Sequence, residues 1–236
     1  MVETADLHHQ ARRRAGRPPQ ALLSSARITK AALKLISHDG YKGLTMAALA
    51  KSLHVAPSAL YNHVRSKQDV LLLVEDHLMG RVDVSAFRNE PWESAVASWA
   101  RSYRDVFAAH LPLIPVIALL PVTNAPATIT MYEAVTQGFL AAGWQRESII
   151  DAIVALESFI YGSAYDVTAP DDIFDVGSLA SEAPHFSDAV QHRGLGPSPG
   201  TGRANDADAA FALGLKAMIA GLAATLGPGS CTAVRT

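Results

Sequence analysis

The segment from Pro57 to His63 gathers hydroxyl, amide and imidazole side chains within a few positions. Its polar members are Ser58, Tyr61, Asn62 and His63. Such side chains hydrogen-bond to phosphate oxygens or to base edges, and a small residue such as Ala59 can contact a thymine methyl group. Lys67 follows at the expected start of a helix, where an added positive charge favours anions further. These residue types offer the chemistry of nucleic-acid recognition.

Two short helices are expected to position this segment. Thr45 has a hydroxyl that can cap a helix, and apolar residues recur at helical spacing from Met46 to Leu53. The pattern breaks at 54–56, and Pro57 then stands at the first position of a second helix, where its missing N–H costs nothing. Ser66 with Asp69 forms a capping box that opens a third helix. Two short helices around a turn describe a helix-turn-helix, although a plain helical hairpin has the same spacing.

The run Leu60-Tyr61-Asn62-His63-Val64, followed by Ser66-Lys67 and preceded by Leu44-Thr45-Met46, resembles the DNA-binding domain of the TetR family. The resemblance implies an all-helical homodimer that represses transcription and releases double-stranded operator DNA when a small effector binds. Matched position by position, it also implies two sets of DNA contacts. The implied phosphate-contacting residues are Thr45, Tyr61, His63 and Lys67, and the implied base-facing residues are Pro57, Ser58, Ala59 and Asn62.

Charge is distributed unevenly along the 236 residues, 49% of which are apolar. Residues 1–74 hold eleven lysines and arginines against four aspartates and glutamates, a net charge of +7. The whole chain has a net charge of −2, so the remainder carries −9. A basic front on an acidic body suits a DNA-binding domain attached to a domain that avoids DNA.

The expected domain order follows from these patterns. Residues 1–23 form a basic flexible arm that either follows phosphates or is only a solvated tail. Residues 24–66 form a three-helix DNA-binding domain whose first helix is capped by Ser24 or Ser25 and ends at Gly40. Residues 67–227 form a helical ligand-binding and dimerisation body with a mobile loop at 194–204, and residues 228–236 form a tail.

Two body helices are apolar enough to be covered on more than one side. One spans about 146–166, and the other restarts at Asp206 or Asp208 and continues to Leu226. Doubled by a two-fold axis, they would give a four-helix bundle between two copies of the chain. We therefore expect a homodimer.

Large side chains on one inward stripe of the body suggest an apolar effector cavity, although most have the alternative interpretation of simple core. Trp99 and Tyr103 lie one turn apart on a helix otherwise rich in Ala and Ser. The candidate effector-binding residues are Trp99, Tyr103, Phe107, Ile117, Val135, Phe139 and Ile153.

Compared with tetracycline-binding members of the family, this chain has Ile117 where a histidine would hold Mg²⁺, and Trp99 and Tyr103 at pocket positions. Asp166 falls near an acidic position that assists the metal, but one carboxylate is a weak magnesium site. We expect a flat, apolar or aromatic effector that binds without metal or any other cofactor.

Two other function classes remain as alternatives, a helical enzyme and a DNA-binding dimer that senses nothing. No nucleophile elbow, phosphate-binding loop, zinc motif or cysteine pair is present, so we expect no catalytic site. The single cysteine, Cys231, and the absence of an N-terminal apolar run favour a cytoplasmic protein. The most apolar stretch, 111–122, is short and contains three prolines, so no membrane partner is expected.

Overall fold

The computed structural model describes residues 23–170, 172–193 and 203–227, with side chains omitted for 203–205. Over these ranges it contains α-helices and short 3-10 turns and no strand, which confirms the all-α class. The α-helices are α1 (Ser25–Gly43), α2 (Met46–Leu53), α3 (Pro57–Tyr61), α4 (Lys67–Met79), α5 (Trp92–Ala108), α6 (Ile114–Ile117), α7 (Pro126–Ala141), α8 (Arg146–Asp166), α9 (Pro184–His192) and α10 (Arg203–Leu226). The 3-10 turns are η1 (Ser85–Arg88), η2 (Leu111–Leu113) and η3 (Gly177–Leu179).

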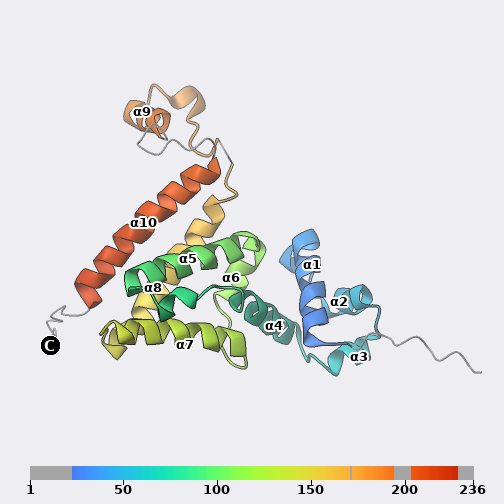
Figure 1. Ribbon diagram of the computed structural model, residues 1–236. Coiled ribbons are helices and arrows are strands. Elements are labelled where there is room, and N and C mark those ends of the chain that lie inside the picture. Colours follow the sequence, from blue (N-terminus) through green and yellow to red (C-terminus); the bar gives the residue numbers. More distant parts are fainter. Residues whose placement is uncertain (1–22, 171, 194–202, 228–236) are drawn as a thin grey trace, which may run out of the picture.

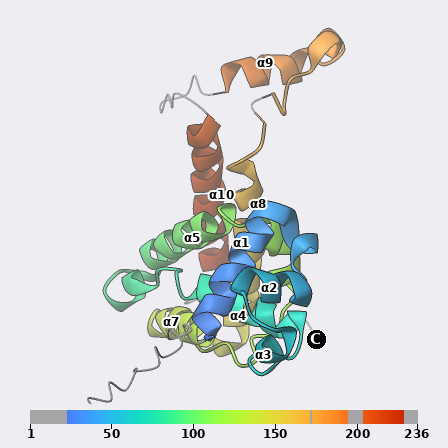
Figure 2. The ribbon, with the colours of Figure 1, turned by 90° about the vertical axis from the view of Figure 1, so that its right-hand side faces the viewer.

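Helices α1, α2 and α3 form a small head domain at one end of the molecule (Figures 1 and 2). Ser24 caps α1, because its Oγ accepts a hydrogen bond from the Arg27 N–H at 3.3 Å. The helix breaks at Gly40, as predicted, because Gly40 has the non-helical angles φ +68° and ψ 179°. A short second helical segment follows this kink and extends α1 to Gly43.

Helix α4 connects the head to the body. At its start the Ser66 Oγ accepts from the Asp69 N–H at 3.1 Å, and the Asp69 Oδ2 accepts from the Arg65 N–H at 2.7 Å. This confirms that Ser66 and Asp69 cap the helix, although the Asp69 carboxylate reaches the N–H of Arg65. Along its length α4 packs against α1 on the head side and against α7 on the body side.

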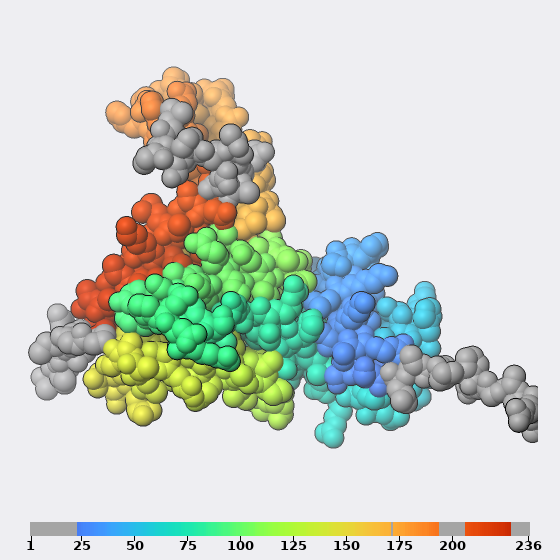
Figure 3. All heavy atoms as spheres, viewed as in Figure 1, coloured from blue at the N-terminus to red at the C-terminus, as the bar shows by residue number. Residues whose placement is uncertain are grey.

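The body is a helical bundle in which α5 packs on α8, and α10 lies along α8 (Figure 1). The start of α10 was predicted too late, since the helix begins at Arg203 and takes in the last two residues of the expected 194–204 loop. The segment with η3 and α9 stands out from the bundle beyond the ends of α8 and α10 (Figures 1 and 3). The rest of that loop, the arm up to residue 22 and the tail from 228 lie outside the described residues.

Two described helices, Arg146–Asp166 and Asp206–Leu226, are long and apolar enough to cross a membrane by length and composition alone. Core helices of soluble proteins pass the same test. Only 17% of the α10 window is buried within one chain, so this helix presents an apolar surface that the chain itself leaves uncovered.

Candidate functional sites

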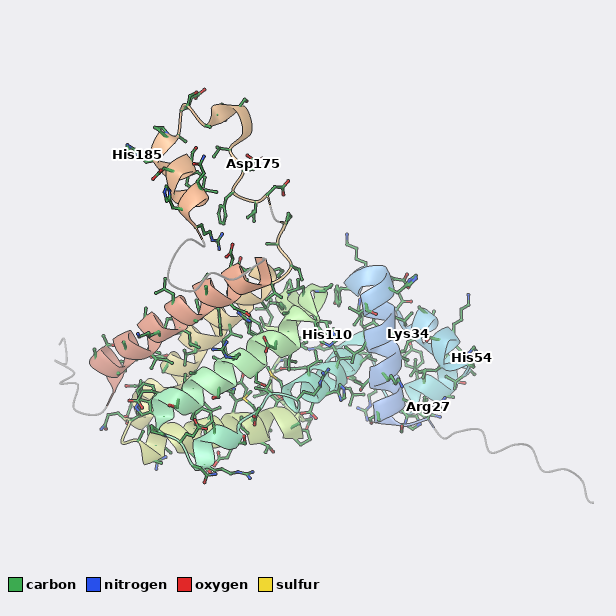
Figure 4. The ribbon with its side chains drawn as sticks, turned by 45° about the horizontal axis from the view of Figure 1, so that its top comes forward. Arg27, Lys34, His54, His110, Asp175 and His185 are labelled. Atoms are coloured by element: carbon green, nitrogen blue, oxygen red, sulfur yellow. The ribbon has the colours of Figure 1, made fainter. Side chains whose placement is uncertain are left out.

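The turn between α2 and α3 has the geometry of a helix-turn-helix. Thr45 caps α2, since its Oγ1 accepts from the Ala48 N–H at 3.1 Å. His54 ends α2 in the left-handed conformation (φ 56°), and its N–H donates to the Lys51 carbonyl at 3.1 Å. Ala56 is extended and Pro57 opens α3, as the sequence indicates. His54 projects outward at the edge of the head (Figure 4).

The outer surface of α3 is open while its inner side is anchored. Leu60 of α3 has no accessible surface, and Ala50 of the adjoining α2 is buried as well. The candidate DNA-contacting residues Thr45, Pro57, Ser58, Tyr61, Asn62 and His63 are exposed, and Ala59 is half-buried. Helix α3 ends at Tyr61, so Asn62 and His63 lie in the turn that follows it rather than within it. The segment 57–63 is thus accessible to a partner, and its contact with DNA stays a prediction.

Lys67 is positioned by an interaction that its sequence neighbours do not reveal. Its Nζ donates to the Tyr41 carbonyl at 3.1 Å and lies 3.7 Å from the centroid of the Tyr41 ring. An ammonium group has three donors, so Lys67 can tie α1 to α4 and still donate to an anion.

The seven candidate effector-binding residues are all buried in the body. Trp99, Tyr103, Phe107, Val135 and Phe139 have no accessible surface, and Ile117 and Ile153 have 2%. No water-sized space therefore adjoins the first five side chains, and a ligand would reach them only after neighbouring side chains move. Their role in binding stays a prediction.

These residues divide into two aromatic groups. Trp99, Tyr103 and Phe107 lie in sequence along α5, with ring centroids 5.6 and 5.2 Å apart, and Tyr161 of α8 packs edge-on to Tyr103 and Phe107. Phe139 instead packs against Trp92 and Trp144, at 5.7 and 4.7 Å. The expected single stripe is thus split into a cluster near the C-terminal end of α5 and a second one near its N-terminal end.

A buried polar network, which the sequence did not predict, lies beside the first cluster. Glu157 of α8 accepts hydrogen bonds through Oε1 from the hydroxyls of Tyr132, at 2.6 Å, and Tyr103, at 3.0 Å. The hydroxyls of Tyr103 and Tyr161 are 2.7 Å apart. Glu75 of α4 is 2% exposed, and its Oε2 has no hydrogen-bond partner. Residues from α4, α5, α7 and α8 therefore meet here.

Burial controls the protonation of this network. Loss of hydration, together with the nearby charges of Asp76 and Glu157, raises the pKa of Glu75 to about 7. Burial also raises the pKa of Glu157, against the lowering effect of the Tyr132 and Tyr103 hydroxyls. The pKa of Tyr103 is raised by burial and by the charge of Glu157. The network consequently disfavours negative charge.

Spacing could have identified both carboxylates. Glu75 directly follows the inward-facing Val74 and precedes Leu78 by three positions, and Glu157 lies between the buried Ile153 and Ile160. A charged residue on the apolar stripe of a helix is a candidate functional group because its burial is costly.

Comparison with known families matches both parts of the chain. Residues 28–74 match the profile of the bacterial regulatory proteins of the tetR family, and residues 87–226 match the tetracyclin repressor-like C-terminal domain. The second match alone covers more than half of the chain. The chain belongs to the TetR family.

Individual TetR-family relatives span almost the whole chain. An HTH-type transcriptional regulator of Saccharopolyspora erythraea is 29% identical and covers 87% of both chains. The class A tetracycline repressor from transposon 1721 of Escherichia coli is 30% identical, over 83% of this chain and 88% of the repressor. The Streptomyces coelicolor TetR-family protein ActR, solved in complex with actinorhodin, is 28% identical with a TM-score of 0.68, over 88% of this chain and 98% of ActR.

Membership assigns functions to the two halves of this TetR-family protein. It is a transcriptional regulator whose N-terminal part, matched over residues 28–74, carries the DNA-binding helix-turn-helix. The body is of the type found in tetracycline repressors. The exposed surface of α3 and the buried network beside α5 are therefore the two places where regulatory contacts are to be sought.

Proposed function

We propose that this protein is a repressor that binds an inverted-repeat operator as a homodimer and leaves it when an aromatic effector enters the body. The observation that supports this most strongly is the connection made by α4. It runs from the DNA-binding head to Glu75, which lies unpartnered inside the aromatic body.

The head would bind DNA with α3 in the major groove. Ser58, Ala59 and Asn62 would meet base edges together with Pro57, and Thr45, Tyr61, His63 and Lys67 would position the head on phosphates. The base-facing set consists of small and amide side chains, so its sequence preference would come from few hydrogen bonds. Two heads on one inverted repeat would lie about one helical turn apart, roughly 34–36 Å.

Dimerisation would use the outer surfaces of α8 and α10. Ile150 and Val154 on α8 and Leu213 on α10 are 61%, 53% and 73% exposed, an arrangement that is costly unless another surface covers it. Within the chain, Gly214 lets α10 approach α8, since a methyl group there would lie 2.7 Å from the Phe159 ring. The pair of helices would thus form half of a four-helix bundle, which a second copy would complete.

Dimerisation can be tested by placing a charge on this surface. Leu213→Glu should shift the protein toward monomer in analytical ultracentrifugation at micromolar concentration, because it buries a carboxylate in the bundle. Leu119→Glu changes a leucine that is more exposed (84% against 73%) and lies outside α8 and α10, so it should leave the dimer intact. A wild-type monomer, or equal behaviour of both variants, would contradict the interface.

The effector would be aromatic and would bind without Mg²⁺. Its contacts would be the buried rings of Trp99, Tyr103 and Phe107, with the other predicted side chains as walls. Ile117 is a buried hydrocarbon and cannot ligate a metal. ActR, a relative of similar fold, was solved with actinorhodin bound. Tight, magnesium-dependent binding of tetracycline would contradict this part of the proposal.

Helix α4 would transmit effector binding to the head. Lys67 ties its N-terminal end to α1, and near its other end Asp76 accepts hydrogen bonds from two N–H groups of α7. A ligand that fixes α4 in a new arrangement relative to α8 would change the tilt of α4 and so the distance between the two heads. The effector would act by favouring the conformation with the wrong separation.

The direct test is selection of binding sites from a random duplex pool, in buffer of cytoplasmic pH and salt. An enriched inverted repeat whose affinity falls steeply with salt is expected, and Asn62→Ala should relax the preference at one position in each half-site. Failure to enrich any repeat would count against a sequence-specific dimer. A ligand-free DNA-binding dimer, the second candidate, would show no thermal stabilisation by any aromatic compound.

A further inference from the structure

Two carboxylates lie near each other in the body, Glu75 buried and Glu157 half-buried. Glu75 comes from α4 and Glu157 from α8, and each raises the electrostatic energy of the other's charged form. In the part of the chain that the structure describes, the ion pairs found join other residues, and none includes Glu75 or Glu157. Burying one unpaired carboxylate is costly, and burying two adds their mutual repulsion.

Aromatic rings surround these carboxylates. Tyr103, Tyr132 and Tyr161 direct their hydroxyls toward Glu157 or toward one another, and Phe107 packs edge-on against Tyr161 at 5.3 Å. Aromatic rings and carboxylates together are the surroundings in which proteins bind organic cations, because the ring quadrupole and the negative charge both attract them. A neutral apolar ligand would leave the Glu75 Oε2 unpartnered.

Trp99 adds a donor to the same cluster. Its Nε1–H is buried and has no hydrogen-bond partner, while its ring packs 5.6 Å from the Tyr103 ring. An unmade hydrogen bond at a buried donor costs about 1–3 kcal/mol. A ligand that brings both a donor for Glu75 and an acceptor for Trp99 would satisfy both groups at once.

We propose that the effector is an aromatic amine whose protonated amino group lies between Glu75 and Glu157, with its ring against Tyr103 and an oxygen acceptor near Trp99. This inference rests on the proposed function, because it names the chemical class of the effector that the body would bind. Glu75 stands on α4, so the ammonium group would hold α4 to α8 in one arrangement. The charge that enters with the ligand would thereby act on the helix that carries the head.

The test compares two probes of matched shape, 1-(aminomethyl)naphthalene and the neutral 1-(hydroxymethyl)naphthalene, with the full-length protein at pH 8. Thermal shift and quenching of tryptophan fluorescence report binding. Wild type should bind the ammonium probe at least tenfold more tightly than the alcohol. Glu75→Gln and Glu157→Gln should each abolish that preference, while Glu147→Gln, which changes an exposed glutamate on α8, should keep it.

Equal affinity for the two probes, binding of neither probe, or an unchanged preference in both glutamine variants would overturn the proposal. Stabilisation by MgCl₂ alone that Glu75→Gln removes would also overturn it, in favour of an inorganic cation. Circular dichroism of each variant verifies that it folds. Glutamine has nearly the shape of glutamate, so each change keeps the packing and removes the repulsion between the two carboxylates. If site selection yields an operator but the protein does not prefer the amine probe, only this inference is refuted. If the protein prefers the amine probe but site selection yields no operator, only the repressor proposal is refuted.

Discussion

The hydrogen bonds from Asp76 to the start of α7 make a sharp test of how α4 is held to the body. The Asp76 Oδ1 accepts from the N–H groups of Ala127, at 2.7 Å, and Thr128, at 3.0 Å. Both belong to the first turn of α7, whose N–H groups have no acceptor within the helix. Thr128 has no accessible surface, so water does not readily replace the carboxylate.

Asp76→Ala should lower the free energy of unfolding by about 2–3 kcal/mol. Loss of a helix cap costs about 0.5–2 kcal/mol, and hydrogen bonds to a charged acceptor add to this when the donors are buried. With a urea dependence of about 2–3 kcal/mol per molar for a chain of this size, the midpoint should fall by about 1 M. The measurement is urea unfolding followed by circular dichroism at one fixed protein concentration.

Two further variants make this measurement decisive. Asp76→Asn keeps an oxygen acceptor without the charge and should lose about half as much. Glu90→Ala removes an exposed carboxylate before α5 and should stay within about 0.5 kcal/mol of wild type. If Asp76→Ala lowers the midpoint no more than Glu90→Ala, the cap does not hold α7 to α4.

Three further predictions concern other sites in the structure. Burial raises the pKa of Glu75 from 4.5 to about 7, so between these values the folded protein binds a proton that the unfolded chain releases. The free energy of unfolding should therefore fall as pH rises from about 5 to 8. Glu75→Gln should reduce that fall, measured as the difference between the urea midpoints at about pH 5.5 and pH 8. His54→Gly should raise the melting midpoint by the equivalent of up to about 1 kcal/mol, because His54 has φ 56°, and an unchanged or lower midpoint would argue against this strain. Gly138→Ala should cost about 1–3 kcal/mol in thermal unfolding, since its methyl group would lie 2.2 Å from the Phe87 ring, whereas Gly162→Ala meets nothing within 4 Å and should not destabilise.

The head could be predicted from sequence nearly residue by residue, because its signals are local. Caps at Thr45 and Ser66 and a proline at the first turn of α3 each act within a few positions, and the structure has all three where the sequence indicates. The exceptions are also local in cause. Gly40 breaks the first helix as predicted, but the backbone returns to helical angles afterwards and a short segment continues to Gly43.

The body was predicted as helices and a buried set, but its chemistry was not. Phe139 shares the apolar periodicity of the other candidates, yet it packs with Trp92 and Trp144 because the crossing of α5 and α7 decides which rings meet. Glu75 and Glu157 lie far apart in sequence and become one site only when α4 and α8 pack into the same bundle. Periodicity gives the inward side of each helix but not its partner across the core.

The central claim is that two copies of this head bind one inverted repeat at a fixed separation, and it can be tested by moving the half-sites. Affinity would be measured by fluorescence anisotropy for the selected operator and for versions with five or ten base pairs inserted at its centre. Five base pairs turn one half-site to the opposite side of the duplex, so the account predicts a loss of at least a hundredfold, down to the affinity of a single half-site. Affinity that does not depend on the spacing would contradict the account, because it would mean that each head binds alone.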